Sequence, residues 1–475
     1  MSTTPYFPPS PHDELTRLYV GKSIRDVPMP AAVLDVAVAR QNCDRMLAAC
    51  KSLGLSWRAH VKTHKTVELT KLQVGDSPSD PVNLIVSTLT EAEFLLPTLQ
   101  EYVAQGRPVN VLDGLPIGPG SIPRLAAVGK ALGNGSISVM LDYPDQVPHL
   151  SLFGDFVPQA FIKVNMGGQR AGVVPRSQAM KDLIKVTLEA HAAGKVGLKG
   201  LYSHAGQSYG GDSRVAAINT LRDELSALLE GAEEVTAACN ASGSPLPPLT
   251  LSVGASPTAL AVQNLLSNQD AESTDNITTA ELRAAAAELS TLIDKIKQQG
   301  HIVEIHAGVY PTLDLQQLAA HSLSSSLLSW KDISFTVVAE VCSRYPSRGK
   351  DGTDEYLIGA GGLALGREAC KAYPGMALLT PWGRQGSGGK MPDSGVEDAE
   401  GWMVGRFSQE HGILTWRSAG GGAEPDELAI GQAVRLWPNH ACITGSHFGW
   451  YFVVDSSREG KEDEIVDIYV RTRGW

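Results

Sequence analysis

The sequence lacks any run of about 18 apolar residues, so no segment is expected to span a membrane. Cysteine is scarce: there are six in 475 residues, none in CxxC spacing, which excludes a disulfide framework and indicates reduced thiols. Basic residues are outnumbered, 40 against 51 acidic ones, and the net charge of −11 argues against nucleic acid or an anionic membrane as a partner. Met1–Asp13 lacks the basic and then apolar order of a signal peptide. We therefore expect a cytoplasmic protein.

Short apolar runs alternate with segments of helical spacing over the first two thirds of the chain. The runs are Ala31–Leu34, Trp57–Val61, Asn83–Val86, Asn110–Leu112, Ile137–Leu141, Ala160–Val164, Leu198–Tyr202, Leu249–Val253 and Ile302–Ile305. Strands that alternate with helices favour parallel pairing through right-handed crossovers. Eight or nine such units predict a closed (β/α)8 barrel of the TIM type, in which chemistry lies at the C-terminal ends of the strands.

From Lys331 the pattern changes to short strand candidates separated by Gly, Pro and Asp, which is typical of an all-β domain. We therefore predict an N-terminal extension over residues 1–29, which either packs on the C-terminal domain or is disordered. An α/β barrel over residues 30–328 and a β domain over residues 329–475 follow it. The polar segments Ser267–Thr278 and Gly383–Glu400 are expected to be surface insertions.

A basic cluster ends the second apolar run, in the segment Arg58–Thr66 (RAHVKTHKT). One interpretation is a solvated or anion-binding rim of the barrel. The other is a Schiff-base lysine, Lys62, whose amine would be freed by the neighbouring cationic groups. The residues alone leave both interpretations open and favour the first.

Two later strand ends carry further polar residues. Lys163–Gly172 (KVNMGGQRAG) places Arg170 after a glycine turn, where it either lies on a surface loop or faces an anionic oxygen. Gly200–Gly206 (GLYSHAG) places Tyr202 and His204 near the barrel mouth, with Tyr209 further on. These rings could contact a flat ligand, although a histidine satisfied by the backbone is an equally good interpretation.

The last two strand ends have the composition of a phosphate site. Ser252–Thr258 (SVGASPT) and His306–Tyr310 (HAGVY) combine glycine turns with hydroxyl groups and free backbone N–H groups. Phosphate sites in such barrels are commonly built by the last βα loops. Each motif is weak alone, but their consecutive positions strengthen the prediction.

One motif in the β domain has the chemistry of a metal site. His440 and Cys442 are two residues apart, so on a strand they would face the same side. Imidazole and thiolate are ligands that zinc prefers. A buried histidine beside a core cysteine is the simpler interpretation of such a pair. With only two protein ligands, a metal site here would be catalytic and open to water and substrate.

Together, the Arg58–Thr66 motif, the strand-end motifs and Pro438–Cys442 resemble the D-serine dehydratase and D-threonine aldolase family, which has the alanine racemase-like fold. The resemblance covers most of the chain and implies a fold-type III pyridoxal-phosphate enzyme. It makes Lys62 the Schiff-base lysine and His440 and Cys442 the metal ligands. The implied cofactor-binding residues are Lys62, Arg170, Tyr202, His204, Tyr209, Ser256, Gly308, Val309 and Tyr310.

Within this family, the His-x-Cys pair resembles the zinc-dependent dehydratase branch, whereas the aldolase branch tends to carry His-x-Asp. The resemblance therefore implies dehydration of D-serine, with D-threonine as a further candidate substrate, and with pyridoxal 5'-phosphate and Zn2+. Retro-aldol cleavage with Mn2+ and a non-catalytic pyridoxal-phosphate carrier are the alternatives. The expected partners are a small D-3-hydroxy amino acid and a second copy of the chain, as a homodimer. Gly359, where the family has an aspartate, and His306, where racemases commonly have an arginine, are departures from the pattern.

Overall fold

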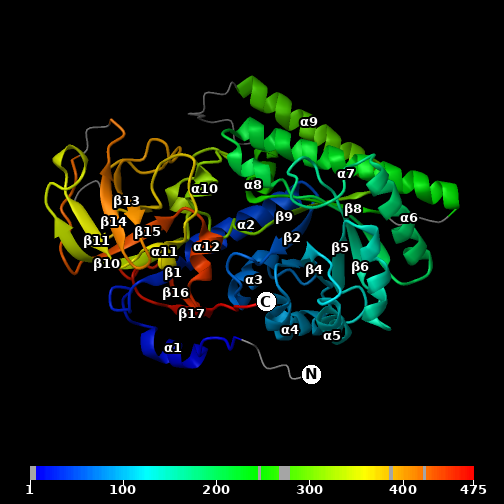
Figure 1. Cartoon of the computed structure of the whole chain (residues 1–475), viewed down its shortest axis with the longest axis horizontal. Coiled ribbons are helices and arrows are strands. Elements are labelled where there is room, and N and C mark those ends of the chain that lie inside the picture. The colour runs from blue at the N-terminus through cyan, green and yellow to red at the C-terminus, as the bar shows by residue number, and fades with distance from the viewer. Residues whose placement is uncertain (1–6, 244–247, 267–278, 385–388, 421–423) are drawn as a thin grey trace.

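The computed structural model describes residues 7–243, 248–266, 279–384, 389–420 and 424–475. It consists of a barrel surrounded by helices and a β domain beside it (Figure 1). The predicted insertion Ser267–Thr278 lies outside the described residues. No helix in the described ranges has both the length and the apolar character needed to cross a membrane.

Eight parallel strands form the closed barrel in chain order. They are β2 (Ser56–His60), β3 (Val82–Val86), β4 (Val109–Pro116), β5 (Ile137–Leu141), β6 (Gln159–Lys163), β7 (Gly197–Tyr202), β8 (Thr250–Val253) and β9 (Ile302–Ala307). Eight of the nine apolar runs became these strands, so the predicted barrel is confirmed. Their apolar side chains alternate between the interior and the surrounding helices, as the two-residue period of a strand requires.

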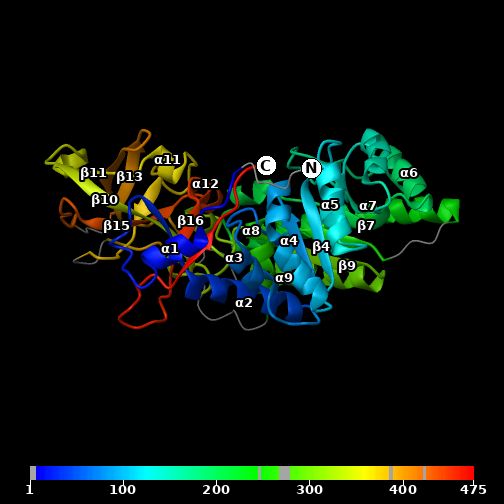
Figure 2. The same cartoon turned by 90° about the horizontal axis from the view of Figure 1, so that it is seen from below.

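The helices cover the outside of the barrel (Figures 1 and 2). They are α2 (Val36–Ser52), α3 (Val67–Val74), α4 (Leu89–Ala104), α5 (Ile122–Leu132), α6 (Gln178–Ala192), α7 (Arg214–Ser242), α8 (Ser256–Ala261) and α9 (Thr279–Gln298). Side-chain caps start several of them: Thr66 accepts from the Leu69 N–H, and Ser177 from the Met180 N–H. The long helices α7 and α9 lie side by side along one edge (Figure 1).

The second sheet contains nine strands in the order β11-β14-β13-β12-β15-β10-β1-β16-β17, and β10 also pairs with β11. The strands are β1 (Ala31–Asp35), β10 (Phe335–Tyr345), β11 (Glu355–Ile358), β12 (Ala377–Leu379), β13 (Gly401–Phe407), β14 (Gly412–Arg417), β15 (Ala433–Pro438), β16 (Trp450–Val454) and β17 (Asp467–Val470). Only the β1–β16 pair is parallel among these described strands. The predicted β domain is therefore present, with β12 as a strand that the sequence pattern did not indicate.

The first apolar run does not belong to the barrel. Ala31–Asp35 forms β1, which pairs with β10 and β16 in the second sheet, so our placement of this segment in the barrel is wrong. A buried five-residue strand has the same apolar composition in either sheet, and composition alone cannot choose between them. The described part of the N-terminal extension also packs on this sheet, through Leu15 and Ile24 against Ile468 of β17.

The described part of Gly383–Glu400 is not a simple surface insertion. Val396 and Ala399 are buried and belong to the same apolar cluster as the barrel. The Trp330 Nε1–H donates to Asp393 Oδ1 at 2.7 Å, and Glu397 lies 3.1 Å from His321 Nε2. This segment therefore joins the two domains, whereas its Gly, Ser and Asp content had indicated only exposed turns.

A buried polar layer lies inside the barrel. The Arg58 Nε–H donates to Glu304 Oε1 at 2.7 Å, and its Nη1–H donates to Asn110 Oδ1 at 2.9 Å. Both charged side chains are almost fully buried, so each needs the other as a partner. An apolar layer that includes Phe161 and Tyr202 also fills the barrel interior. The barrel is thus a packed core rather than a channel, which leaves ligands to bind at its mouth.

Candidate active site

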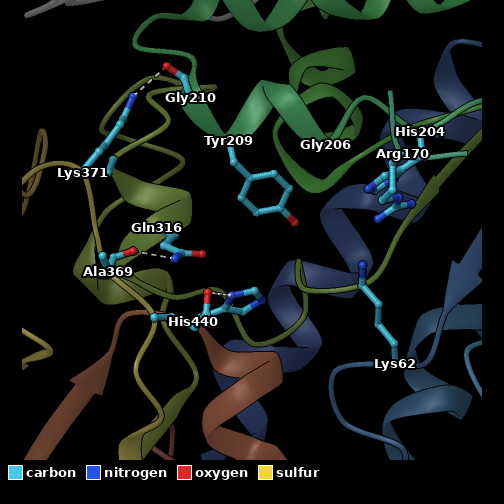
Figure 3. A pocket seen from close by; sticks show the side chains of 12 residues that line it. Lys62, Arg170, His204, Gly206, Tyr209, Gly210, Gln316, Ala369, Lys371 and His440 are labelled. Carbon is cyan, nitrogen blue, oxygen red and sulfur yellow. Dashed lines mark hydrogen bonds and ion pairs between the residues drawn. The ribbon is translucent and has the colours of Figure 1, made fainter. Parts of the chain in front are cut away.

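A cavity of about 460 Å³ lies where the barrel mouth meets the β domain (Figure 3). Its volume falls within the range of about 300–1,000 Å³ that is usual for small-molecule sites. Five of the predicted site residues line it: Lys62, Arg170, His204, Tyr209 and His440. They come from segments up to 378 positions apart in the sequence numbering, Lys62 to His440, and only the fold brings them together.

Lys62 follows β2, and its amine points into the cavity (Figure 3). Its side chain passes directly beside Gly308, in the loop after β9. A Cβ atom at position 308 would lie 3.1 Å from Lys62 Cε and 3.3 Å from the His60 carbonyl oxygen. Glycine at 308 therefore provides the space that Lys62 needs to reach the cavity, which fits its predicted place in the cofactor site.

The loop that carries Lys62 is held by the end of the chain. The Thr472 N–H donates to the Lys65 carbonyl at 3.0 Å, and the Arg471 Nη2–H donates to the Thr63 carbonyl at 3.3 Å. The Lys65 amine pairs with the buried carboxylate of Glu91 at 2.8 Å. Lys65 is thus occupied as an ion-pair partner, whereas Lys62 is the lysine of this loop that faces the cavity.

Two neutral histidines lie near Lys62. Burial, followed by the charge of Lys62, holds the pKa of both His60 and His204 well below the usual value. His204 Nδ1 lies 2.7 Å from the Gly254 carbonyl oxygen. Because a carbonyl can only accept, Nδ1 carries the proton and Nε2 remains an acceptor. His204 thus presents a neutral ring at the predicted cofactor site.

Tyr202 lies in the barrel interior. It stacks on His306 with ring centroids 4.2 Å apart and an interplanar angle of 7°. His306 Nδ1 lies 3.0 Å from Ser252 Oγ, and its buried Nε2 has no hydrogen-bond partner within the described ranges. Tyr202 is therefore buried in the barrel interior and is not one of the residues that line the cavity.

The predicted phosphate-binding residues are adjacent in space. The Val309 N–H donates to Ser256 Oγ at 3.3 Å, which joins the loops after β8 and β9. The Tyr209 hydroxyl also forms a hydrogen bond with Ser256. Burial raises the pKa of Tyr209 above its usual value, and this effect is larger than the opposite effect of the hydrogen bond. The Gly308 backbone and the hydroxyl groups of Ser256 and Tyr209 are donors of the kind that a phosphate prefers, and Val309 joins the two loops through its bond to Ser256.

Tyr310 is not brought to the cavity. Its buried ring packs edge-on against Trp57 at 5.2 Å, within the apolar cluster between strands and helices. The prediction of Tyr310 as a cofactor residue is therefore not supported by its position. The adjacent Val309 is buried in a separate cluster shared with the β domain. The chain bends at Gly308 and Val309 and turns at Tyr310, directly after β9, and the motif HAGVY does not show which way the Tyr310 side chain points.

His440 and Cys442 meet, but not for the reason that we predicted. β15 ends at Pro438, His440 is the N-cap residue of α12 (Ala441–Ser446), and Cys442 lies in its first turn. The expectation that both side chains project from one strand is therefore wrong. The turn from strand into helix brings the imidazole and the thiol within hydrogen-bond contact instead.

The surroundings favour a thiolate at Cys442. Burial opposes ionisation, but the hydrogen bond with His440, its charge and the charge of Lys62 together lower the pKa of Cys442. For His440, burial lowers the pKa, but Cys442 and then Asp314 raise it to about 9. Thr63 Oγ1 lies 3.1 Å from Cys442 Sγ. This contact joins the loop of Lys62 directly to the His440–Cys442 pair.

The pair also fits a metal ion by its donor chemistry. His440 Nδ1 is buried and has no hydrogen-bond partner among the residues described. No group of three or more His, Cys, Asp and Glu side chains is arranged to hold a metal in the described parts of the chain. A metal on imidazole and thiolate would therefore keep positions open to water and substrate, which is the arrangement of catalytic sites.

Sequence reasoning missed several residues of this site. Asp314 caps α10 (Leu315–Leu318) and accepts from the Ala441 N–H at 2.8 Å, which fixes the start of α12. Gln316 and Glu368 line the cavity. None of the three lies in a recognisable motif, and each reaches the site through a loop whose path the sequence pattern does not predict.

The fold and the site indicate the class of protein. A barrel with a lysine directly after its first strand and an adjoining β domain is the arrangement of the alanine racemase-like pyridoxal-phosphate enzymes. The family model described as "Alanine racemase, N-terminal domain" matches residues 34–271, and that described as "Putative serine dehydratase domain" matches residues 334–454. The chain is 36% identical to D-serine dehydratase of Schizosaccharomyces pombe, over 98% of this chain and 96% of that protein. It therefore belongs to the D-serine dehydratase family.

Two further comparisons agree with this family and its fold. D-serine dehydratase of Saccharomyces cerevisiae is 31% identical over 96% of this chain and 98% of that protein. The solved structure of D-threo-3-hydroxyaspartate dehydratase from Delftia sp. HT23 superposes with a TM-score of 0.69 at 24% identity. It covers 95% of this chain and all of that one. This likeness supports the overall fold, including the β domain.

Proposed function

We propose that this chain is a lyase, a D-serine ammonia-lyase, that eliminates water from D-serine and releases pyruvate and ammonia. D-threonine would give 2-oxobutyrate in the same way. The observation that carries the proposal is the meeting of Lys62, from the barrel, with the His440–Cys442 pair, from the β domain, at one cavity. The similarity to D-serine dehydratases along nearly the whole chain supports it.

Pyridoxal phosphate would be held by Lys62, Arg170, His204, Tyr209, Ser256, Gly308 and Val309, with Tyr202 beneath. When bound, it supplies a ring that accepts the electron pair left on Cα. Lys62 Nζ would take the proton from the substrate Cα, and the entry of its side chain into the cavity past Gly308 supports this role. The neutral Nε2 of His204 adds no competing positive charge beside that amine.

Zinc would be held by His440 and Cys442. When bound, it supplies a Lewis acid for the 3-hydroxyl group, which is otherwise a poor leaving group. The buried Nδ1 of His440 and the lowered pKa of the Cys442 thiol support this role. Asp314 would keep the pair in place by holding the first N–H of α12.

Thr63→Val is expected to weaken zinc binding about 10- to 100-fold, since it removes the hydroxyl that contacts Cys442 Sγ. The measurement is competition with a chromophoric chelator. Thr63→Ser keeps the hydroxyl and should retain most of the affinity. Equal zinc affinity in Thr63→Val and in the wild-type protein would show that the contact between Thr63 and Cys442 does not contribute to zinc binding.

The proposed function is tested by incubating the purified chain, supplied with pyridoxal phosphate and zinc, with D-serine and with D-threonine. Pyruvate from D-serine is the expected product. Glycine plus an aldehyde, formed from D-threonine, would identify an aldolase instead. Retention of the cofactor without any product would identify a carrier of pyridoxal phosphate.

The cytoplasm is the proposed location, and it is supported by the cysteines: all six are free. Assembly as a homodimer stays a prediction of the family resemblance.

A further inference from the structure

A carboxylate that the proposed chemistry does not use lies beside the metal pair. Glu368 lines the cavity, and its Oε2 lies 3.7 Å from His440 Nδ1. Its side chain is 45% exposed, so it faces the open part of the cavity rather than the core. In the described parts of the chain, His440 is the one ion-pair partner found for Glu368.

The position of Glu368 is fixed by side-chain amides on both sides. The Asn439 Nδ2–H donates to the Glu368 carbonyl at 2.9 Å, and the Gln316 Nε2–H donates to the Ala369 carbonyl at 2.8 Å. The Gln316 N–H in turn donates to the Asn439 carbonyl at 3.1 Å. Because Asn439 directly precedes His440, the backbone at Glu368 is held at a set place relative to the metal pair.

The two basic residues nearest to Glu368 in the sequence, Arg367 and Lys371, are directed elsewhere. The Lys371 amine donates to the Gly210 carbonyl at 3.3 Å, on the opposite side of the cavity from Lys62 (Figure 3). The Arg367 guanidinium lies over the ring of Phe407, 5.2 Å from its centroid. Glu368 therefore keeps its contact with His440 and places a carboxylate beside that residue in the cavity.

The proposed reaction sets the direction of the substrate. Its Cα must lie near Lys62 Nζ, and its 3-hydroxyl group must lie near His440 and Cys442. Any further substituent on C3 then extends into the space beside His440, where Glu368 is. A hydrogen or methyl group meets no penalty there, but a carboxylate would face a like charge at short range.

We propose that Glu368 is a specificity-determining residue that restricts this site to 3-hydroxy amino acids with an uncharged substituent on C3 and rejects those with a carboxylate there. The proposal rests on the proposed function and narrows its substrate class. The negative charge of Glu368, at this partly exposed position, should lower kcat/KM for a substrate with a carboxylate on C3 about tenfold relative to an enzyme with an uncharged residue there. The effect should appear mainly as a higher KM.

The test compares D-serine with D-threo-3-hydroxyaspartate in the zinc- and pyridoxal-phosphate-loaded enzyme. Glu368→Gln is isosteric and should shift the ratio of the two kcat/KM values about tenfold or more towards the diacid. Glu368→Asp retains the charge and should keep the wild-type preference. Glu410→Gln removes an exposed carboxylate of the same domain that does not line the cavity, and it should leave the ratio unchanged.

The zinc dissociation constant of each variant separates specificity from metal positioning. A weaker zinc affinity with an unchanged substrate ratio would overturn the proposal and make Glu368 a support for His440. A wild-type enzyme that already prefers the diacid would overturn it as well. If the wild-type chain forms no pyruvate from D-serine, the proposed function fails, whereas an unchanged ratio in an active Glu368→Gln enzyme contradicts this inference alone.

Discussion

Lys62→Ala is expected to abolish the visible absorbance of cofactor bound covalently to the protein and to reduce D-serine turnover about 10⁴-fold or more. The physical reason is that, in the proposed function, one amine both attaches the cofactor and takes the Cα proton. The cavity offers no second lysine at this position, since Lys371 is held by carbonyl groups on the far side. Absorbance spectra and pyruvate release, measured on the same preparation, check both effects.

Lys65→Met is the matched control for Lys62→Ala, because Lys65 lies three residues away in the same loop. Its amine pairs with Glu91 at 2.8 Å. The absorbance band should therefore remain, while the free energy of unfolding falls because a buried carboxylate loses its partner. A band that survives in Lys62→Ala, or that disappears in a folded Lys65→Met protein, would show that the lysine is wrongly assigned.

The barrel could be predicted because its strands are short apolar runs at regular intervals, each bounded by turn residues. β1 could not be assigned, since Ala31–Asp35 has the same character as the barrel strands and its partners β10 and β16 lie far away in the sequence. The residues of a strand indicate that it is buried, but they do not indicate to which sheet it belongs.

The candidate site was predictable where a motif and a strand end coincide. Lys62, His204 and Arg170 follow β2, β7 and β6, and the barrel rule alone directs attention to them. The position of the Tyr310 ring could not be predicted, because the rule gives the loop but not the direction of each side chain. Glu368 was missed because its place depends on hydrogen bonds from Asn439 and Gln316 that no local pattern encodes.

Cys442→Ala is expected to lower D-serine dehydration about 10³-fold while leaving the absorbance of the bound cofactor in place. The difference from Lys62→Ala is expected because the cofactor would be attached to the barrel, whereas the proposed metal ligands come from the β domain. Loss of a thiolate ligand removes the Lewis acid that assists departure of the hydroxyl group. Treatment of the wild-type enzyme with a chelator should have the same effect and should be reversed by added zinc.

Cys342→Ala is the matched control, since Cys342 is an exposed thiol in the same domain and does not line the cavity. It should leave both activity and metal content unchanged. Activity that persists in metal-free wild-type enzyme would contradict the role of His440 and Cys442, even if Lys62 behaves as expected. Thr63 contacts Cys442 and is the residue next to Lys62 in the sequence. A small shift of the absorbance band in Cys442→Ala is therefore compatible with Cys442 as a metal ligand. Loss of the band is not, since it would mean that the thiolate holds the cofactor loop rather than the metal.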